Sequence, residues 1–455
     1  MGAPDTTAFL NFSTPSHATL NGGSRDVIEP ATGQVLSTIG IANAADVANA
    51  SRAAAAAQKA WVAVPPRDKA AILRRAGDLF QQHFDELALY CTRETGAILP
   101  KGQHEIREAI TICHLASSLP MQSQGHVLPS VPGRSSIARR VPHGVVGVIS
   151  PFNFPLILTL RAVAPALAAG NAVIVKPDTR TPVSGGLMIA RIFAEAGLPK
   201  DLLHILPGDA VAGKHLKKVS LELGGANNLI ILDDADLDIA ASNAAWGAWL
   251  HQGQICMAAN HIYVHSSIAA QLTQRLVAKA THLPVGDGAS GQVALGPLID
   301  TKQRDRVHAM VQDSIQAGAK LEAGATYDGL FYKPTVLSGV KPGMRVFDEE
   351  TFGPVANLIT FDTDEEVIAL ANNNTGSLSS AIISPSIGRA MAMGQQLKSG
   401  MVHINDQTVN DDCVNPFGGP GIAGNGTSVG GPADLEEYTQ WQWITVKDTA
   451  PAYPF

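Results

Sequence analysis

The chain has 455 residues, too many for one ordinary domain and enough for about three. Its 33 Lys and Arg residues against 40 Asp and Glu give a formal net charge of −7 without a basic stripe, which argues against a general nucleic-acid binder. With 45% hydrophobic and 16% charged residues, the chain can bury large cores and is not disordered. These values are typical of a soluble, multi-domain α/β protein and favour an enzyme.

The first third of the chain predicts helices. Residues 43–61 are Ala-rich, and Pro65 and Pro66 end that pattern. A second helix is expected from about Arg67, because apolar side chains recur at spacings of three and four on one face. These side chains are Leu73, Ala76, Phe80, Phe84 and Leu87.

From Val141 the pattern changes to that of a parallel sheet. Residues 144–150 and 172–176 are short, continuous runs rich in Val and Ile, which suit strands covered on both faces. Residues 158–170 between them predict a helix that ends at Gly170, so the three segments form a βαβ unit. Residues 181–199 predict a further helix and residues 202–206 a further strand. This region is typical of a nucleotide-binding α/β domain.

A second block begins near residue 217 and continues past residue 418. It contains a predicted strand at 219–223 and more alternation of strands and helices, as in residues 227–250. Two isolated strand candidates, residues 135–144 and 440–447, lie outside this alternation. They could pair into a small sheet beyond the main domains, or form an edge hairpin packed on the body, and the pattern alone favours neither.

Targeting and membrane segments are not predicted. Residues 1–20 lack the basic start and apolar core of a signal peptide, and prolines interrupt the uncharged residues 144–160, whereas a bilayer helix needs about 20 predominantly apolar residues. The four cysteines show no CxxC pair and no metal-ligand spacing, so we expect neither a disulfide framework nor a metal site. The cytoplasm is the expected compartment. The cysteines are Cys91, Cys113, Cys256 and Cys413.

Two residues are candidates for covalent and acid–base chemistry. A lone cysteine is usually inert packing, but Gly253 leaves room for a ligand beside Cys256, and a helix starting at Met257 would lower the thiol pKa. Glu222 lies between an apolar strand and a Gly-Gly turn, where a carboxylate can serve as a general base. A solvated glutamate at a strand end is the simpler alternative.

Two further residues suit ligand binding. Asn153 is held between prolines and aromatic residues, and its amide cannot titrate, so beside a nucleophile it would donate to an oxyanion. Lys176 ends a buried strand, which is where α/β sheets bind ligands, and its ammonium suits a ribose hydroxyl or a phosphate.

Taken in order, these motifs resemble the aldehyde dehydrogenase superfamily over nearly the whole chain. They are "SPFNFP", "IVKP", "LELGG" and "GQICMA", with Cys256 34 residues after Glu222, then "EETFGPV" and "NPFGG". Within that family, "WGAWLHQGQICMAANH" and "GMVHINDQTVND" are most similar to the aromatic aldehyde dehydrogenases of the benzaldehyde or salicylaldehyde type. As a set, the motifs are highly specific.

The resemblance implies a role for each matching residue. Cys256 would attack an aldehyde as a thiohemiacetal and then a thioester, Asn153 would hold the oxyanion, and Glu222 would activate the hydrolytic water. Hydride would pass to a nicotinamide cofactor, NAD as the first choice and NADP as the second. Lys176 would bind the adenosine ribose, Glu350 the nicotinamide ribose, and Phe352 would pack near the nicotinamide. The other residues implied at the cofactor are Ser150, Phe152, Thr179 and Gly224.

The implied fold is α/β and aldehyde dehydrogenase-like, with a Rossmann-type cofactor domain, an α/β catalytic domain and a small oligomerisation sheet. The expected domains are an NAD(P)-binding domain at residues 1–126 and 145–221, a catalytic domain at 222–417, and bridging strands at 127–144 and 430–455. A homodimer or homotetramer is expected, acting on a small aldehyde, without nucleic-acid or membrane partners.

The chain also departs from the family pattern. Thr179 stands where NAD-preferring members place a Glu that repels a 2′-phosphate, so both cofactors could be accepted. Between Gly208 and Leu216 the chain is short by roughly thirty residues, about one supersecondary unit, and loses a helix N-terminus that would face the pyrophosphate. Two hypotheses follow: an active NAD(P)-dependent aromatic aldehyde dehydrogenase, or a catalytically impaired paralogue that is a structural partner in an oligomer or keeps only esterase activity.

Overall fold

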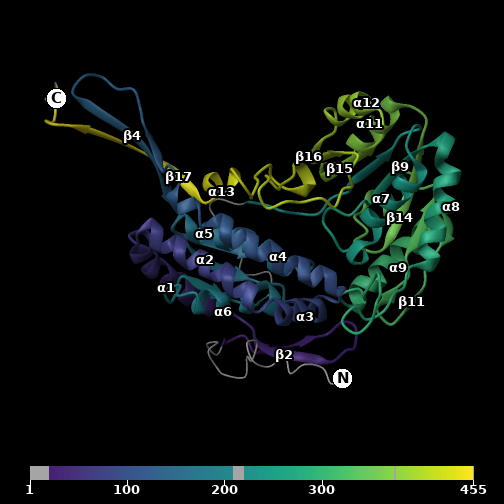
Figure 1. The fold of residues 1–455 in the computed structure, drawn as a ribbon, viewed down its shortest axis with the longest axis horizontal. Coiled ribbons are helices and arrows are strands. Elements are labelled where there is room, and N and C mark those ends of the chain that lie inside the picture. Colours follow the sequence, from purple (N-terminus) through teal and green to yellow (C-terminus); the bar gives the residue numbers. More distant parts are fainter. Residues whose placement is uncertain (1–19, 209–219, 374–375, 454–455) are drawn as a thin grey trace.

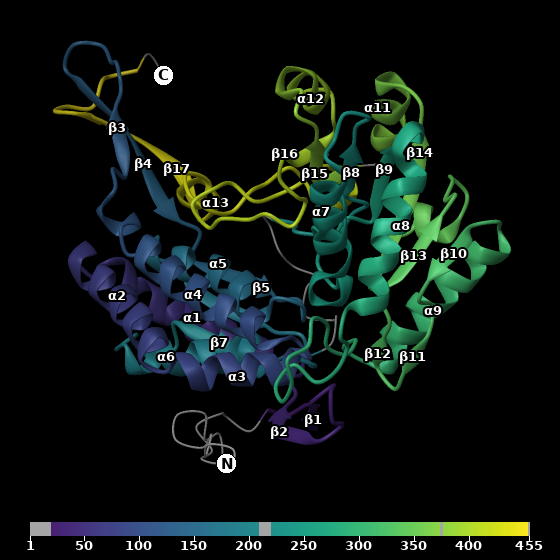
Figure 2. The ribbon, with the colours of Figure 1, turned by 45° about the vertical axis from the view of Figure 1, so that its right-hand side comes forward.

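The computed structural model describes residues 20–208, 220–373 and 376–453, and these residues form two lobes joined along one side (Figure 1). One lobe is mainly helical and carries a small parallel sheet. The other contains a larger mixed sheet covered by helices. The long C-terminal segment around α13 (Ala433–Glu437) runs across from one lobe to the other (Figure 2).

The helical lobe begins with elements whose ends are set by local sequence. Asn43 and Asp46 form a reciprocal capping box at the start of the first helix, and Gly96, at φ 68°, ends the third. The second predicted helix ends sooner than expected, because the chain turns at His83, so Phe84 and Leu87 belong to the next helix. These elements are β1 (Ser24–Ile28), β2 (Val35–Gly40), α1 (Ala44–Val62), α2 (Pro66–Gln82), α3 (Phe84–Thr95), α4 (Leu99–Ala116) and η1 (Leu119–Met121).

The small sheet of this lobe confirms the predicted βαβ unit. Strands β5 (Val145–Ile149), β6 (Ala172–Lys176) and β7 (Leu203–Ile205) are parallel, with β6 in the middle. Helix α5 (Pro155–Ala168) connects β5 to β6. The helix predicted at 181–199 begins instead with a π-helical turn, η2 (Val183–Leu187), and continues as α6 (Met188–Glu195).

The strand predicted at 219–223 is not formed in its described part. Residues 220–223 run along the loop that carries Ala423, and Glu222 makes only an isolated antiparallel bridge to Gly424. The Leu223 amide donates to the Ala423 carbonyl with 3.0 Å between N and O, so this amide is satisfied outside any sheet. The chain between the strand at 202–206 and this segment is just long enough for one short helix. Most of that link, residues 209–219, lies outside the described residues.

The second lobe is built on a seven-stranded sheet in the order β10-β13-β14-β9-β8-β15-β16. All neighbours are parallel except β10 and β13. Its central strands are buried along their whole length, which is why their sequences are nearly continuous in apolar and small residues. The strands are β8 (Asn228–Ile231), β9 (His261–His265), β10 (Lys320–Ala323), β13 (Thr335–Ser338), β14 (Val355–Phe361), β15 (Ser377–Ile383) and β16 (Ser399–Ile404).

Helices and short segments surround this sheet. They are α7 (Leu237–Trp249), η4 (Leu250–Gly253), α8 (Ser266–His282), α9 (Thr301–Gln316), α10 (Arg345–Asp348), α11 (Asp364–Asn372), α12 (Ile387–Gly394) and η5 (Gly421–Ala423), with the hairpin β11 (Tyr327–Asp328) and β12 (Phe331–Tyr332). No helix within the described residues is both long enough and apolar enough to cross a membrane.

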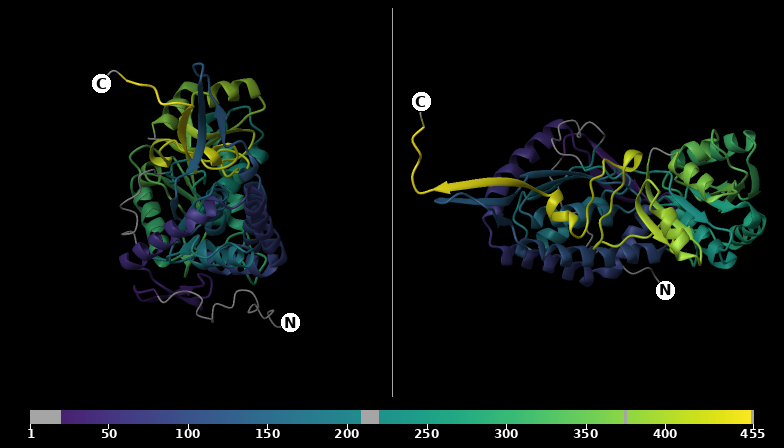
Figure 3. Two further views of the ribbon diagram at one scale, coloured as in Figure 1. Left: turned by 90° about the vertical axis from the view of Figure 1, so that its left-hand side faces the viewer. Right: turned by 90° about the horizontal axis from the view of Figure 1, so that it is seen from above.

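The two isolated strand candidates pair with each other, as the first of the two interpretations predicted. Strand β17 (Thr439–Lys447) runs antiparallel to β4 (Arg134–Pro142) from Thr439↔Pro142 to Lys447↔Arg134, and β3 (Gly125–Val127) pairs on the other side of β4. This three-stranded sheet projects well beyond the helical lobe (Figure 3). Trp441 and Trp443 of β17 are 48% and 66% exposed, so the arm presents apolar surface to solvent.

Candidate active site

Cys256 lies in the loop between η4 and β9. Its side chain is partly buried, whereas Cys91, Cys113 and Cys413 are fully buried, so Cys256 is the most accessible of the four thiols. The helix expected from Met257 is absent, because one turn closed by the Ala258 amide and the Ile255 carbonyl leads almost directly into β9. Burial, with the nearby charges of Glu350 and Glu222, raises the thiol pKa instead of lowering it.

The backbone that leads to Cys256 is strained. His251 and Gln252 have φ values of 46° and 57°, and Gly253 follows at 66°, three left-handed residues in succession. A Cβ at position 253 would lie 2.1 Å from the carbonyl oxygen of Gly353. The glycine is therefore required by backbone packing, which corrects the expectation that it leaves room for a ligand. Such strain is found at functional sites, where the surrounding fold holds it in place.

Glu222 presents a buried carboxyl group. Neither carboxyl oxygen has a hydrogen-bond partner among the described residues, and burial raises the pKa of Glu222 to about 8. The nearby Arg161 lowers this pKa and Asp411 raises it. A carboxyl group with a pKa near 8 can exchange protons around neutral pH, which fits the general-base interpretation better than the solvated alternative.

Asn153 lies in the loop between β5 and α5 and is 2% exposed. Its carbonyl oxygen accepts a hydrogen bond from the Lys101 ammonium at 2.7 Å, while its side-chain amide donates none to any described residue. The amide is thus available as a donor to a bound group. The aromatic neighbours of Asn153 reach two other parts of the site, since Phe154 meets His251 edge-on at 5.5 Å and Phe152 meets Phe352 at 5.8 Å between ring centroids.

The predicted adenosine side of the cofactor site lies at the carboxyl end of β6. Lys176 ends that strand, and no described carboxylate lies within ion-pair distance of its ammonium. Thr179, three residues on, accepts a hydrogen bond from Arg25 of β1 with 2.6 Å between Nη1 and Oγ1. Ser150, at the end of the neighbouring strand, is buried and accepts a hydrogen bond from Thr159, so it shapes the backbone here.

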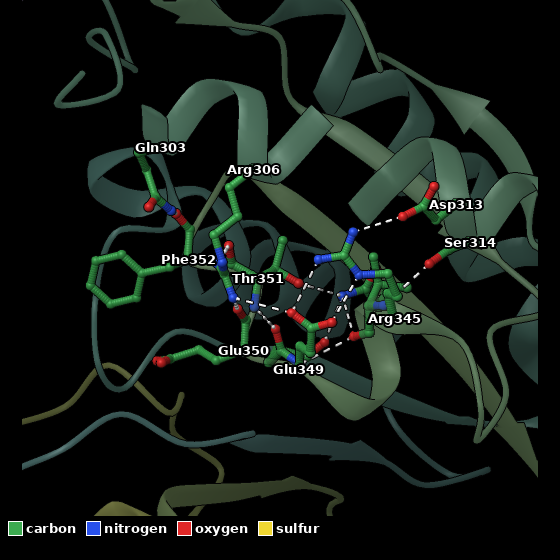
Figure 4. A network of polar contacts seen from close by, with 12 residues as sticks. Gln303, Arg306, Asp313, Ser314, Arg345, Glu349, Glu350, Thr351 and Phe352 are labelled. Carbon is green, nitrogen blue, oxygen red and sulfur yellow. Dashed lines mark hydrogen bonds and ion pairs between the residues drawn. The ribbon is translucent and has the colours of Figure 1, made fainter. Parts of the chain in front are cut away.

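The predicted nicotinamide side is formed by residues 350–352 (Figure 4). Arg306 donates to the Glu350 carbonyl at 2.8 Å, and Gln303 donates to the Phe352 carbonyl at 2.8 Å, so the backbone is anchored to α9. The side chains of Glu350 and Phe352 point away from Arg345. Phe352 has φ 51°, a left-handed conformation that turns its ring toward Phe152.

Gly224 and Glu350 lie against each other across the site. A Cβ at position 224 would lie 2.1 Å from a Glu350 carboxylate oxygen, so a side chain there would displace the Glu350 carboxylate. Burial raises the pKa of Glu350 to about 7, and the Gly225 amide, which donates a hydrogen bond to it, opposes that rise. The charge of Glu350, like that of Glu222, adds to the effect of burial in raising the pKa of Cys256.

Three charged residues of the site were not predicted from the sequence. Arg161, whose side chain is 3% exposed, pairs with Asp411 beside Glu222, and Lys101 and Arg25 contact Asn153 and Thr179. The available signal was weak: Arg161 interrupts an apolar helix and Lys101 precedes Glu105 by four residues, but both patterns usually mark solvated faces. Their partners are distant in sequence, so only the fold identifies them.

A profile of the "Aldehyde dehydrogenase family" matches residues 18–216 and 209–444. The two matched segments meet at the position of the expected missing unit. A vanillin dehydrogenase from an Amycolatopsis strain is 48% identical over 464 aligned positions, covering 95% of this chain and 96% of the relative. A benzaldehyde dehydrogenase [NAD(+)] from Pseudomonas putida is 46% identical over 464 positions, covering 95% of each chain. Because 464 positions exceed the 455 residues of the chain, both alignments include residues that this chain lacks.

Solved structures agree with these relatives. A betaine aldehyde dehydrogenase from Staphylococcus aureus in complex with NAD+ has a TM-score of 0.92 and 28% identity, covering 96% of this chain and 94% of that one. A succinate-semialdehyde dehydrogenase from Burkholderia pseudomallei has a TM-score of 0.90 and 34% identity, covering 93% of this chain and 95% of that one. The sequence motifs, the placement of Cys256 near the buried carboxyl groups of Glu222 and Glu350 and both comparisons lead to one conclusion: this chain belongs to the aldehyde dehydrogenase family.

Proposed function

We propose that this enzyme oxidises an aromatic aldehyde to the carboxylic acid with NAD as the principal cofactor. The observation that carries the proposal is the placement of the partly exposed Cys256 within electrostatic reach of Glu222 and Glu350, the two carboxyl groups that the family motifs assign to hydrolysis and cofactor binding. The vanillin and benzaldehyde dehydrogenases that are 48% and 46% identical support an aromatic substrate.

The residues of the chain divide the chemistry between them. The Cys256 thiol gives up its proton to the Glu222 carboxylate, which passes it on to solvent, and the sulfur adds to the aldehyde carbon while the carbonyl π electrons move to oxygen. The free amide of Asn153 donates to that oxyanion. A nicotinamide cofactor, when bound, would supply the hydride acceptor needed to oxidise this Cys256 adduct to the thioester. Glu222 as the carboxylate then takes a proton from water, which attacks the thioester and releases the acid and the thiol.

The residues present fit a nicotinamide cofactor on its two sides. Lys176 would hold the adenosine ribose, with Ser150 and Thr179 beside it, and Glu350 would hold the nicotinamide ribose next to Gly224. Phe152 and Phe352 would flank the nicotinamide. We further propose that NADP is also accepted, because Thr179 adds no negative charge and Arg25 brings a cation to its hydroxyl. Neither Arg25 nor Lys176 forms an ion pair with a described residue, so both charges can face a phosphate.

Assembly and location complete the proposal. We propose that the β3–β4–β17 arm, with exposed Trp441 and Trp443, pairs with a second subunit in a homodimer or homotetramer. The domain boundaries predicted from the sequence are retained, with the cofactor domain at 1–126 and 145–221 and the catalytic domain at 222–417. Four free thiols fit the cytoplasm.

The test is a direct assay of benzaldehyde and vanillin oxidation with NAD or NADP, following reduced cofactor and the acid product together. Equal amounts of acid and reduced cofactor, both lost in Cys256→Ala, are expected. The alternative of an impaired structural partner predicts no turnover even at millimolar cofactor. The retained Cys256, Glu222 and Asn153 make that alternative the less favoured one.

A further inference from the structure

A buried ammonium group supports the loop that carries Asn153. Lys101 and Glu105 lie one turn apart on α4, and their side chains are 4% and 0% exposed. The Lys101 ammonium donates to the Asn153 carbonyl at 2.7 Å and to the Glu105 carboxylate, and lies 4.4 Å from the centroid of the Phe154 ring. The ammonium is thus held by Glu105 of its own helix and contacts both Asn153 and Phe154 of the loop.

Glu105 fixes the other end of the same loop. Its second carboxylate oxygen accepts hydrogen bonds from the Leu156 amide at 3.0 Å and the Ile157 amide at 3.3 Å, in the first turn of α5. A carboxylate there satisfies free amides and interacts well with the helix dipole. The Lys101–Glu105 pair therefore connects α4 to the loop on both sides of Phe154.

The loop also contacts the segment that leads to Cys256. His251, the first of the three left-handed residues before the nucleophile, meets the Phe154 ring edge-on at 5.5 Å between ring centroids. Burial lowers the pKa of its imidazole, and the Asn153 backbone lies close enough to oppose that shift. The Asn153 peptide is consequently held by Lys101 from α4 and contacted by His251 from the nucleophile segment. A shift of this peptide changes the position of the Asn153 amide relative to Cys256.

We propose that Lys101 is a positioning residue for the reaction, acting through the Asn153 peptide to hold the Asn153 amide where it faces the oxyanion on the substrate. The inference rests on the proposed function, because it requires Asn153 to be the oxyanion donor. A buried ion pair is a poor device for stability, since removing two charges from water costs about as much as their attraction returns. The contacts of the Lys101–Glu105 pair with the loop that carries Asn153 suit it to positioning that loop instead.

The experiment is a double-mutant cycle between Lys101→Met and Asn153→Ala. The readouts are kcat and KM for benzaldehyde oxidation and the rate of cofactor-free hydrolysis of p-nitrophenyl acetate. Lys101→Met is expected to lower kcat and ester hydrolysis about 10- to 100-fold, approaching the loss from one oxyanion donor, with KM changed less than about threefold. In the Asn153→Ala background, Lys101→Met should then lower kcat and ester hydrolysis by less than about twofold, because the amide that Lys101 positions is gone.

Lys69 supplies a matched control. It is also a buried lysine, 7% exposed, whose ammonium donates to the Val62 carbonyl at 3.2 Å and lies 5.5 Å from the Trp61 ring, but it belongs to α2. Lys69→Met should lower the melting temperature while leaving kcat within about twofold. If Lys101→Met does not fold, Lys101→Met/Glu105→Gln takes its place, since it removes both charges and keeps an acceptor for the Leu156 amide.

The outcomes separate the two proposals. A full, additive loss from Lys101→Met in the Asn153→Ala background would mean that Lys101 acts on the fold rather than through Asn153, and would overturn the inference. A kcat for Lys101→Met no lower than that of Lys69→Met would also overturn it. Undiminished activity of Asn153→Ala would instead remove the oxyanion role on which the proposed function depends.

Discussion

The guanidinium of Arg25 donates a hydrogen bond to the hydroxyl of Thr179, with 2.6 Å between the two atoms, although the residues are 154 positions apart in sequence. The contact brings a cation of β1 to the carboxyl end of β6, next to Lys176. A family glutamate at position 179 would pair with this arginine and repel a 2′-phosphate. With threonine there, Arg25 keeps a positive charge at the expected ribose.

Arg25→Ala should therefore weaken NADP binding about tenfold and NAD binding less than about twofold, because only NADP offers a phosphate to the lost cation. Titration of each cofactor by tryptophan fluorescence or melting temperature measures this. Arg52→Ala is the control, as Arg52 also makes one exposed side-chain hydrogen bond, to Asn49. Equal weakening of NAD and NADP in Arg25→Ala would contradict the assignment.

Cys256 should be the acyl carrier and the thiol most open to alkylation. Cys256→Ala should abolish aldehyde oxidation, whereas Cys413→Ala should leave it largely intact, because Cys413 is buried. Iodoacetamide should label Cys256 first, and faster as the pH rises, since burial and nearby carboxylates raise its pKa. Peptide mass spectrometry reads the labelling; equal modification of all four thiols in the folded protein would exclude this role.

The hydrolytic step should depend on pH through Glu222. Its pKa is raised to about 8, so the carboxylate is the minor form at pH 7 and its fraction rises about tenfold per pH unit below 8. Deacylation, measured as steady-state p-nitrophenyl acetate hydrolysis, should rise with pH and level off above about 8. Ester hydrolysis by Glu222→Gln should be slow and should not change with pH. Glu350→Gln removes another carboxyl group with a raised pKa, and it should keep the wild-type pH dependence of ester hydrolysis.

Ester hydrolysis should be less affected than aldehyde oxidation by the missing unit. Cys256, Asn153 and Glu222 lie outside residues 208–216, and ester cleavage needs no hydride acceptor. Loss of one or two charge-assisted phosphate contacts at about 1.5–3 kcal/mol each should weaken cofactor binding by roughly ten- to a thousand-fold.

Insertion of a family-like segment between Gly208 and Leu216 should then lower the cofactor concentration needed, with little change in ester hydrolysis. Saturation at micromolar cofactor in the natural chain would argue against this. An esterase as inactive as the dehydrogenase would favour the structural-partner alternative.

Removal of residues 439–455 should disrupt assembly. The deletion takes away β17 and leaves β4 with an open edge, so monomers or aggregates are expected in size-exclusion chromatography with light scattering. Deletion of residues 448–455 alone, which follow β17, is the control and should leave the oligomer unchanged. The same oligomer after the longer deletion would show that the arm is not the contact.

Much of the framework was predictable from the sequence because it is local. Strands β5 and β6 are short Val-rich runs, and α1 begins at a capping box that can be read from Asn43. The segment 220–223 was predicted wrongly because its backbone pairs with a loop two hundred residues on, around Ala423, while Leu221 and Leu223 stay 38% and 47% exposed. The predicted direction of the thiol pKa shift was wrong for a similar reason: burial, followed by the charges of Glu350 and Glu222, acts on Cys256 only after folding.

The pairing of β17 with β4 also affects how the protein is made. Trp443 donates to Ser136 across 307 positions of sequence, so β4 leaves the ribosome long before its partner exists. At about 5–20 residues per second, the wait lasts on the order of 15–60 seconds. During that interval the edge of β4 that β17 later covers stays open. The order of synthesis therefore exposes a strand edge that can aggregate, and slower translation lengthens that exposure.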